Sequence, residues 1–130
     1  RGARAYELDG PVYMRLGRLA VPVVNDEKDF SFTLGKGIVM REGTDVTIVA
    51  CGLMVQAALE AADALAERGV SAEVIDMHTI KPIDADLIVE SASKTGRVVT
   101  CEEHSVIGGL GSAVCDVLAE RCPFPSARWA

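Results

Sequence analysis

The stretch VVTCEEHSVIGGLGSAV, residues 98–114, decides the fold that the sequence predicts. It begins with a short apolar run, continues through a charged corner, and then passes a glycine-rich turn into an amphipathic segment. This is the order of a strand, a loop and the start of a helix. Because ligands of open α/β sheets bind beyond the carboxyl ends of the strands, any functional site is expected in this loop.

The glycines of this turn, Gly108, Gly109 and Gly111, allow two interpretations. Glycines at a helix start bring backbone N–H groups against an anion, so the turn could hold a phosphate group. The stretch lacks the third glycine of the dinucleotide-binding fingerprint and the Gly-Lys-Ser/Thr end of a P-loop, which makes this signal weak. The alternative is that small residues let the helix start close to the sheet or to another subunit.

The charged corner, Glu102, Glu103 and His104, is equally ambiguous. A carboxylate beside an imidazole can perform acid–base catalysis. A histidine at the end of a strand can equally complete a hydrogen bond or an interface, and clusters of titratable groups are only weak evidence of catalysis.

The remainder of the chain alternates strands with helices. This rhythm predicts parallel pairing through right-handed crossovers and a three-layer α/β/α sandwich around a mostly parallel five-stranded sheet. Asp84 is the expected N-cap of the second helix, and Asp86 in its first turn has an ordinary helix-dipole explanation. The expected strands are 37–41, 45–51, 72–77, 97–101 and 126–129, and the expected helices are 54–68, 84–94 and 109–122.

The amino-terminal region reads differently. Residues 11–16 are typical of a strand, and Arg15 and Arg18 beside it are either a clamp for a phosphate or carboxylate group or two surface arginines. The charged, non-periodic segment 21–32 indicates a linker. We therefore expect residues 1–21 to be the tail of a preceding domain and residues 22–130 to form the main domain.

Composition limits the partners of this chain. Its 130 residues suit one domain, and 49% hydrophobic content with 5% aromatics suits a sheet packed by small aliphatic side chains. The net charge of −6 argues against nucleic acid or an anionic membrane as a partner. No run of about 18 apolar residues is present to span a bilayer.

The four cysteines have neither zinc-binding nor redox-motif spacing. They are expected to be buried thiols without disulfides in a reducing compartment, and we expect the protein in the cytoplasm. The first residue is Arg rather than Met, which suggests a piece of a longer polypeptide. The cysteines are Cys51, Cys101, Cys115 and Cys122.

Three motifs carry a family resemblance: GPVYMRLGR at 10–18, DMHTIKPID at 76–84 and EEHSVIGGLGSA at 102–113. Together they resemble the C-terminal part of a transketolase, and most closely the C-terminal subunit of bacterial split transketolases. Deoxyxylulose-phosphate synthase and the β subunit of 2-oxo acid dehydrogenase E1 share the Lys-Pro-x-Asp and Gly-Gly-x-Gly elements and stay as alternatives. So does an independent small-ligand-binding domain.

The resemblance implies that the parent enzyme transfers a two-carbon ketol unit between sugar phosphates in the pentose phosphate pathway. It implies thiamine diphosphate and Mg²⁺ as cofactors, held by residues that precede this segment. No catalytic residue is then expected in the segment, and alone it should bind neither cofactor and be inactive. Arg18 matches the family's arginine that reaches the phosphate group of the sugar.

The resemblance also implies an antiparallel first strand and a role in assembly. The partner would be the N-terminal transketolase region or subunit, in a homodimer or heterotetramer. Interface or packing roles, rather than catalytic ones, are then implied for Glu102, Glu103, His104, Gly108, Gly109 and Gly111.

Overall fold

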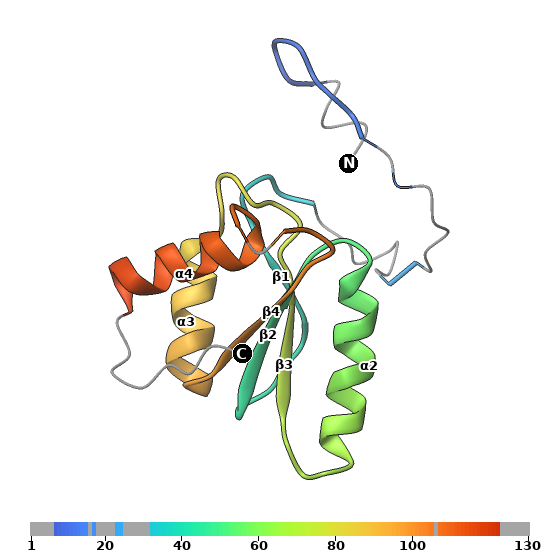
Figure 1. The fold of residues 1–130 in the computed structure, drawn as a ribbon, viewed down its shortest axis with the longest axis vertical. Coiled ribbons are helices and arrows are strands. Elements are labelled where there is room, and N and C mark those ends of the chain that lie inside the picture. The colour runs from blue at the N-terminus through green and yellow to red at the C-terminus, as the bar shows by residue number, and fades with distance from the viewer. Residues whose placement is uncertain (1–6, 16, 18–22, 25–31, 106, 123–130) are drawn as a thin grey trace. The chain divides into compact units, whose positions relative to one another are not determined.

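The computed structural model describes residues 7–15, 17, 23–24, 32–105 and 107–122. The chain divides into two compact units, Arg1–Phe32 and Thr33–Ala130. The second unit contains all the described helices and strands (Figure 1). In chain order they are β1 (Ile38–Arg41), β2 (Val46–Ala50), α2 (Met54–Ala66), β3 (Ala72–Asp76), α3 (Ala85–Thr95), β4 (Val98–Cys101) and α4 (Leu110–Arg121).

The strands form one mixed sheet in the order β1-β3-β2-β4. Strand β2 runs parallel to both β3 and β4, whereas β1 runs antiparallel to β3. This confirms the predicted α/β sheet with an antiparallel first strand. The predicted fifth strand, 126–129, lies outside the described residues.

The helices cover both faces of the sheet. Helix α2 packs on one face, and α3 and α4 pack together on the other, which gives the three predicted layers (Figure 1). The main apolar cluster lies between the sheet and the α3–α4 pair. Its members are Val49, Ile75, Met77, Ile88, Ala92, Val98, Leu110, Val114, Val117 and Leu118.

The central strands β2 and β3 are buried on both faces, which accounts for their apolar sequences. All five residues of β3 are buried, as are four of the five in β2. A strand covered on both faces lacks the alternation of a surface strand and reads as a continuous apolar run. The exceptions are Glu73 and Asp76 of β3, two charged residues that are 0% and 2% exposed, and the buried Thr47 of β2.

Helix α3 begins and ends as its sequence predicts. The Asp84 side chain accepts a hydrogen bond from the Leu87 N–H, and Gly96 ends the helix in the left-handed conformation at φ 68°. Arg121 of α4 donates a hydrogen bond to Asp86 Oδ1 over 2.7 Å, and that contact lowers the pKa of Asp86. Asp84 therefore caps the helix as expected, whereas the pairing of Asp86 with Arg121 was not predicted, and the helix-dipole role of Asp86 stays a prediction.

The predicted strand at 11–16 is wrong over the residues that can be checked. Residues 11–15 have no regular secondary structure, and the side chains of Val12, Tyr13 and Met14 are exposed. A strand needs a neighbour for its backbone groups and an apolar surface for one face, and apolar residues alone supply neither. The assignment of residues 1–21 to a preceding domain stays a prediction.

In the part of the chain that the structure describes, no helix is long and apolar enough to cross a membrane.

Candidate functional site

The candidate site lies at the carboxyl end of the parallel strands. The loops that follow β3 and β4 meet there, and so does the segment leading into β1, because antiparallel pairing sets Ile38 opposite Asp76 at the end of β3 (Figure 1). The sheet register brings Ala50, Asp76 and Cys101 level with one another. The second and third motifs of the sequence therefore lie at one end of the sheet.

Glu102 closes the start of helix α4. It follows directly on β4, and its carboxylate accepts hydrogen bonds from Leu110 N–H at 2.8 Å and Gly111 N–H at 3.0 Å. These N–H groups are the ones that an anion would bind at a helix N-terminus. The place available to a phosphate group is thus filled by a carboxylate of the same chain.

The glycines make room for this contact. A Cβ atom at Gly109 would lie 2.3 Å from Glu102 Oε2, and one at Gly111 would lie 3.1 Å from Thr100 Oγ1. Gly108 has φ +75°, a conformation that other residues rarely adopt. The turn is therefore small because the Glu102 carboxylate and the strand approach the helix start closely.

The crest of the loop is held by short-range hydrogen bonds. The Ile107 N–H donates to Ser105 Oγ at 3.2 Å, and the Gly108 N–H donates to Ser112 Oγ at 3.0 Å. Glu103 and His104 are exposed, and the described residues show no hydrogen bond between them. The structure therefore does not assemble the acid–base pair considered from the sequence, and an interface role for these two residues stays a prediction.

Asp84 fixes a second loop at the same end. It is 6% exposed and, besides capping α3, accepts hydrogen bonds from Gly37 N–H at 3.1 Å and Lys36 Nζ at 3.3 Å. The segment before β1 is thereby tied to the start of α3. The motif at 76–84, which ends at Asp84, also contains His78, whose Nδ1 lies 2.9 Å from Thr79 Oγ1.

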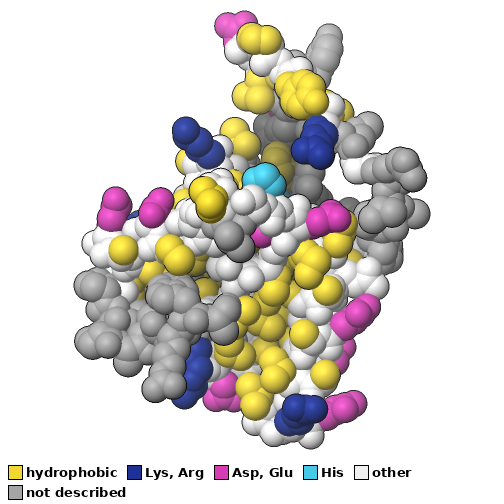
Figure 2. All heavy atoms as spheres, viewed as in Figure 1, with side chains coloured by type: hydrophobic (Ala, Val, Ile, Leu, Met, Phe, Trp, Pro, Cys, Tyr) yellow, Lys and Arg dark blue, Asp and Glu magenta, His cyan; other side chains and the backbone are white. Residues whose placement is uncertain are grey.

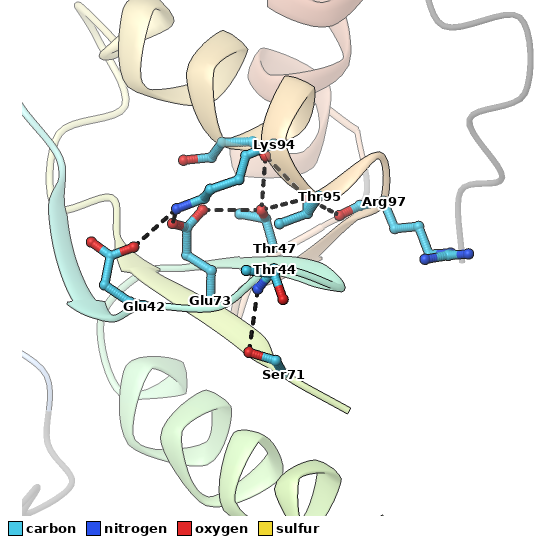
Figure 3. A network of polar contacts seen from close by, with 9 residues as sticks. Glu42, Thr44, Thr47, Ser71, Glu73, Lys94, Thr95 and Arg97 are labelled. Atoms are coloured by element: carbon cyan, nitrogen blue, oxygen red, sulfur yellow. Dashed lines mark hydrogen bonds and ion pairs between the residues drawn. The ribbon is translucent and has the colours of Figure 1, made fainter. Parts of the chain in front are cut away.

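A buried polar network at the opposite end of the sheet was missed from the sequence (Figure 3). Lys94 Nζ forms a very short contact with Glu73, which is fully buried, and a 3.0 Å contact with Glu42. Thr47 Oγ1 donates to Glu73 Oε1 at 3.1 Å and lies 2.8 Å from Thr95 Oγ1. Hydrogen bonds to Glu73 and then Glu42 raise the pKa of Lys94. The sequence signal for this network is Glu73, a glutamate flanked by the apolar residues Ala72 and Val74 in a buried strand.

The cysteines correct one expectation. No disulfide joins any of the four, but Cys115 is exposed rather than buried, and Cys51, Cys101 and Cys122 are only partly buried. Burial raises the pKa of the Cys101 thiol. Cys115 lies on the outer side of α4, where the small helix residues around it do not reveal which side faces water.

Two observations bear on whether the described residues could hold thiamine diphosphate or its metal. Within the described ranges, no three His, Cys, Asp or Glu residues could hold a metal ion together. The helix start that could take a diphosphate already binds Glu102. Arg15 is exposed, and Arg18 lies outside the described residues.

Comparison with known proteins gives close matches. The chain is 54% identical over 120 residues to the 6-deoxy-6-sulfo-D-fructose transketolase subunit SqwH of Clostridium sp. (strain MSTE9), covering 92% of this chain and 37% of that relative. It is 45% identical over 115 residues to the 1-deoxy-D-xylulose-5-phosphate synthase of Heliobacterium modesticaldum (strain ATCC 51547 / Ice1), covering 88% of this chain and 18% of that relative. The chain thus spans well under half the length of either relative.

A solved structure agrees with the fold. A chain described as "Split gene transketolase, inactive beta4 tetramer" superposes with a TM-score of 0.87 at 58% sequence identity, covering 93% of this chain and 40% of that chain. The family described as "Transketolase, C-terminal domain" matches residues 35–126, which include every described strand and helix. The protein therefore belongs to the transketolase C-terminal domain family.

Proposed function

We propose that this chain is the C-terminal domain of a thiamine-diphosphate-dependent transketolase that transfers a two-carbon ketol unit between sugar phosphates. The observation that carries the proposal is the 54% identity to a named transketolase subunit, spread over 92% of this chain. The enzyme would act in the cytoplasm, in pentose phosphate metabolism. Its partner would be the N-terminal transketolase region or subunit, within a homodimer or a heterotetramer.

In this proposal the domain supports assembly and the partner region carries the chemistry. Thiamine diphosphate, with Mg²⁺, supplies the electron sink for the two-carbon transfer. The residues of this chain instead satisfy one another. Glu102 accepts hydrogen bonds from two N–H groups at the α4 start, and Asp84 accepts one from the Leu87 N–H at the α3 start, so these N–H groups are already bound within the chain. The domain would position its neighbours without touching the reacting atoms.

Arg18 is proposed to bind the anionic end of the substrate. A guanidinium group can donate two parallel hydrogen bonds to a phosphate group and so orient a sugar far from its reacting carbon. One relative is named for a sulfonated sugar, and a sulfonate accepts the same pair of hydrogen bonds. In the assembled enzyme, Arg18→Ala should raise KM for a phosphorylated or sulfonated substrate far more than it changes kcat; an unchanged KM for both would refute this role.

The first test of the division of labour is calorimetric titration of this chain with thiamine diphosphate and Mg²⁺. We expect no binding heat from the chain alone, and ketol transfer once the N-terminal region is added. Saturable binding to the chain alone would refute the proposal. In that case the same titration would be repeated with Glu102→Ala, which frees the N–H groups at the α4 start. Tighter binding by this variant would indicate that the α4 start holds the diphosphate.

A second candidate function is supported by the 45% identity to a 1-deoxy-D-xylulose-5-phosphate synthase. The assembled enzyme separates the two, because only the synthase would form 1-deoxy-D-xylulose 5-phosphate. Formation of that product without ketol transfer between sugar phosphates would favour this second candidate.

A further inference from the structure

The Lys-Pro-x-Asp element at 81–84 lies against the segment through which the chain enters the domain. β1 is the first strand of the second unit, and the few residues before it lead into the sheet (Figure 1). Asp84 Oδ2 accepts a hydrogen bond from Gly37 N–H at 3.1 Å, and Asp84 Oδ1 accepts one from Lys36 Nζ at 3.3 Å. Capping of α3 needs neither contact, because the cap is a separate bond from the Leu87 N–H.

Two glycines let the entering chain approach this element closely. Gly35 has φ +81°, which residues with a Cβ rarely adopt, and a Cβ atom there would lie 3.2 Å from Pro82 Cγ. A Cβ atom at Gly37 would lie 2.8 Å from Leu87 Cδ2 and 3.0 Å from Met77 Cε. The backbone of the entering chain therefore lies directly on the motif, on the start of α3 and on the core.

Polar contacts, rather than apolar burial, hold the first part of this segment. Lys36 is exposed, and Leu34, the one large apolar side chain of the segment, is 57% exposed. Hydrophobic and basic side chains accordingly reach the surface at this end of the second unit (Figure 2). Asp84, by contrast, is 6% exposed and forms an ion pair with Lys36. We call residues 33–37, Pro82 and Asp84 the entry clamp.

We propose that the entry clamp fixes the link between this domain and the preceding chain, and that Asp84 is thereby a positioning residue for ketol transfer by the assembled enzyme. The proposal rests on the function proposed above, in which the N-terminal region carries the chemistry. A domain that does not touch the reacting atoms affects the reaction through the parts that it holds, and the covalent link is one of them. Small displacements far from the reacting atoms lower rates strongly, because the reacting groups must be held in a narrow range of geometry.

The first test asks whether Asp84 closes the clamp. Serine caps helices as aspartate does but has a single, shorter oxygen, so Asp84→Ser keeps the α3 cap and loses the bonds to Lys36 and Gly37. Trypsin cleaves after lysine, and the peptide bond between residues 36 and 37 lies inside the clamp. We expect this bond to be cut at least about tenfold faster in the variant, since cleavage follows the population of the open form.

Mass spectrometry of the fragments measures this rate. Cleavage after Arg68, which is exposed in the turn between α2 and β3, is the internal control and should not change. Equal cleavage after Lys36 in the variant and the wild type would overturn the proposal, because Asp84 would then not hold the entering chain.

The second test measures ketol transfer by the assembled enzyme. Asp84→Ser should lower kcat/KM at least about fivefold, as expected when a remote change displaces the reacting groups. The matched control is Gly96→Ala, which weakens α3 at its far end, at φ +68°, where an added Cβ atom contacts nothing. Below both unfolding midpoints a merely structural role predicts equal values for the two variants, and equal values would overturn the positioning role.

A further pair of variants leaves the α3 cap untouched. Lys36→Met removes the ion pair with Asp84, whereas Lys36→Arg keeps a cation at the same exposed position. We expect kcat/KM to fall in Lys36→Met and to stay at the wild-type value in Lys36→Arg; the same kcat/KM in both would count against the clamp. Ketol transfer by the wild type decides the proposed function, whereas the trypsin pattern and the ratios between variants decide the clamp, so each fails separately.

Discussion

Carboxylate side chains have different binding partners at the two ends of the sheet. At the amino end, Glu73 is fully buried and bound by the side chains of Lys94 and Thr47. At the carboxyl end, Glu102 and Asp84 bind backbone N–H groups at the starts of α4 and α3. The amino-end carboxylate holds strands and a helix together, whereas the carboxyl-end carboxylates fix loops that expose apolar side chains. We call the amino end closed, because its carboxylate is fully buried, and the carboxyl end open, because its ordered loops expose apolar side chains.

The strongest test of this comparison is a glycine-to-alanine substitution at each end of the sheet, with the free energy of unfolding as the quantity compared. A Cβ at Gly43 would lie 2.1 Å from the Glu73 backbone nitrogen and 2.2 Å from the Ala72 carbonyl carbon, with no side chain to move aside. We expect Gly43→Ala to cost about 3 kcal/mol or more in the free energy of unfolding, the upper range for overpacking. Urea denaturation measures it.

The matched change at the carboxyl end is Gly52→Ala. Gly52 has φ +61° and nothing within 4 Å of an added Cβ, so only the backbone conformation opposes the substitution. We expect a cost of about 1 kcal/mol, the left-handed penalty for a residue with a Cβ. Equal costs at the two glycines would contradict the contrast between a closed and an open end.

The next largest effect should come from Lys94→Met. Removing the ammonium leaves the buried Glu73 carboxylate without its cation, which costs about 3–5 kcal/mol for fully buried pairs. The Lys94 side chain is 36% exposed, so water can reach the site and we expect a smaller loss of about 2 kcal/mol. Lys81→Met at the open end, where the lysine is exposed, should change monomer stability by less than about 0.5 kcal/mol.

The pH dependence gives this prediction a sign. The folded-state pKa of Lys94 is raised, so its contribution is fully present below the unfolded lysine value of about 10.4 and is lost as pH rises through the higher folded-state value. The wild type should therefore lose its advantage over Lys94→Met in alkaline solution. An advantage that is constant from neutral pH to pH values above that range would show that the ion pair is not its source.

A smaller effect is expected from Glu102→Ala. The substitution removes both hydrogen bonds that cap α4 and should cost about 1 kcal/mol, the usual value of a lost cap. Amide hydrogen exchange at Leu110 and Gly111 should speed up. Glu103→Ala, on the exposed neighbour, should change neither stability nor exchange at these amides; equal effects at both positions would mean that Glu102 does not cap the helix.

The last prediction concerns the burial of Cys101 beneath the carboxyl-end loops and is tested by thiol labelling of the wild-type protein. Cys115 is exposed, whereas burial raises the pKa of Cys101 at the end of β4 and so lowers its thiolate fraction. At mildly alkaline pH, a disulfide reagent should label Cys115 well before Cys101. Mass spectrometry of the labelled peptides reports the order, and prior labelling of Cys101 would show that this end is open down to the sheet.

The sequence predicted elements whose signals are local. The α3 boundaries rest on Asp84 and Gly96, and the structure has both as caps, while α2 ends at Ala66 rather than at the predicted Arg68. The central strands carry continuous apolar runs and were placed to within a residue or two. Such signals do not depend on which distant residues a segment contacts, so the sequence alone is enough to recognise them.

What the sequence did not reveal depends on partners distant along the chain. Glu102 reaches amides eight and nine residues away only because the loop folds back, and Lys94 meets Glu73 across 21 residues. Neither contact leaves a periodic signal. The opposite failure occurred at 11–15, where an apolar pattern predicted a strand that these residues do not form.

The place of β1 in the sheet bears on the order in which the domain folds. Although β1 comes first in the chain, it pairs with β3, the third strand in sequence, and lies at the edge of the described sheet. We expect the β2–α2–β3 unit to form before β1 joins it, because β1 has no partner strand until β3 is in place. Contacts that close late speed unfolding when they are weakened but hardly slow folding. The strand that links the domain to the preceding chain is thus expected to be the last to join the sheet and the first to leave it.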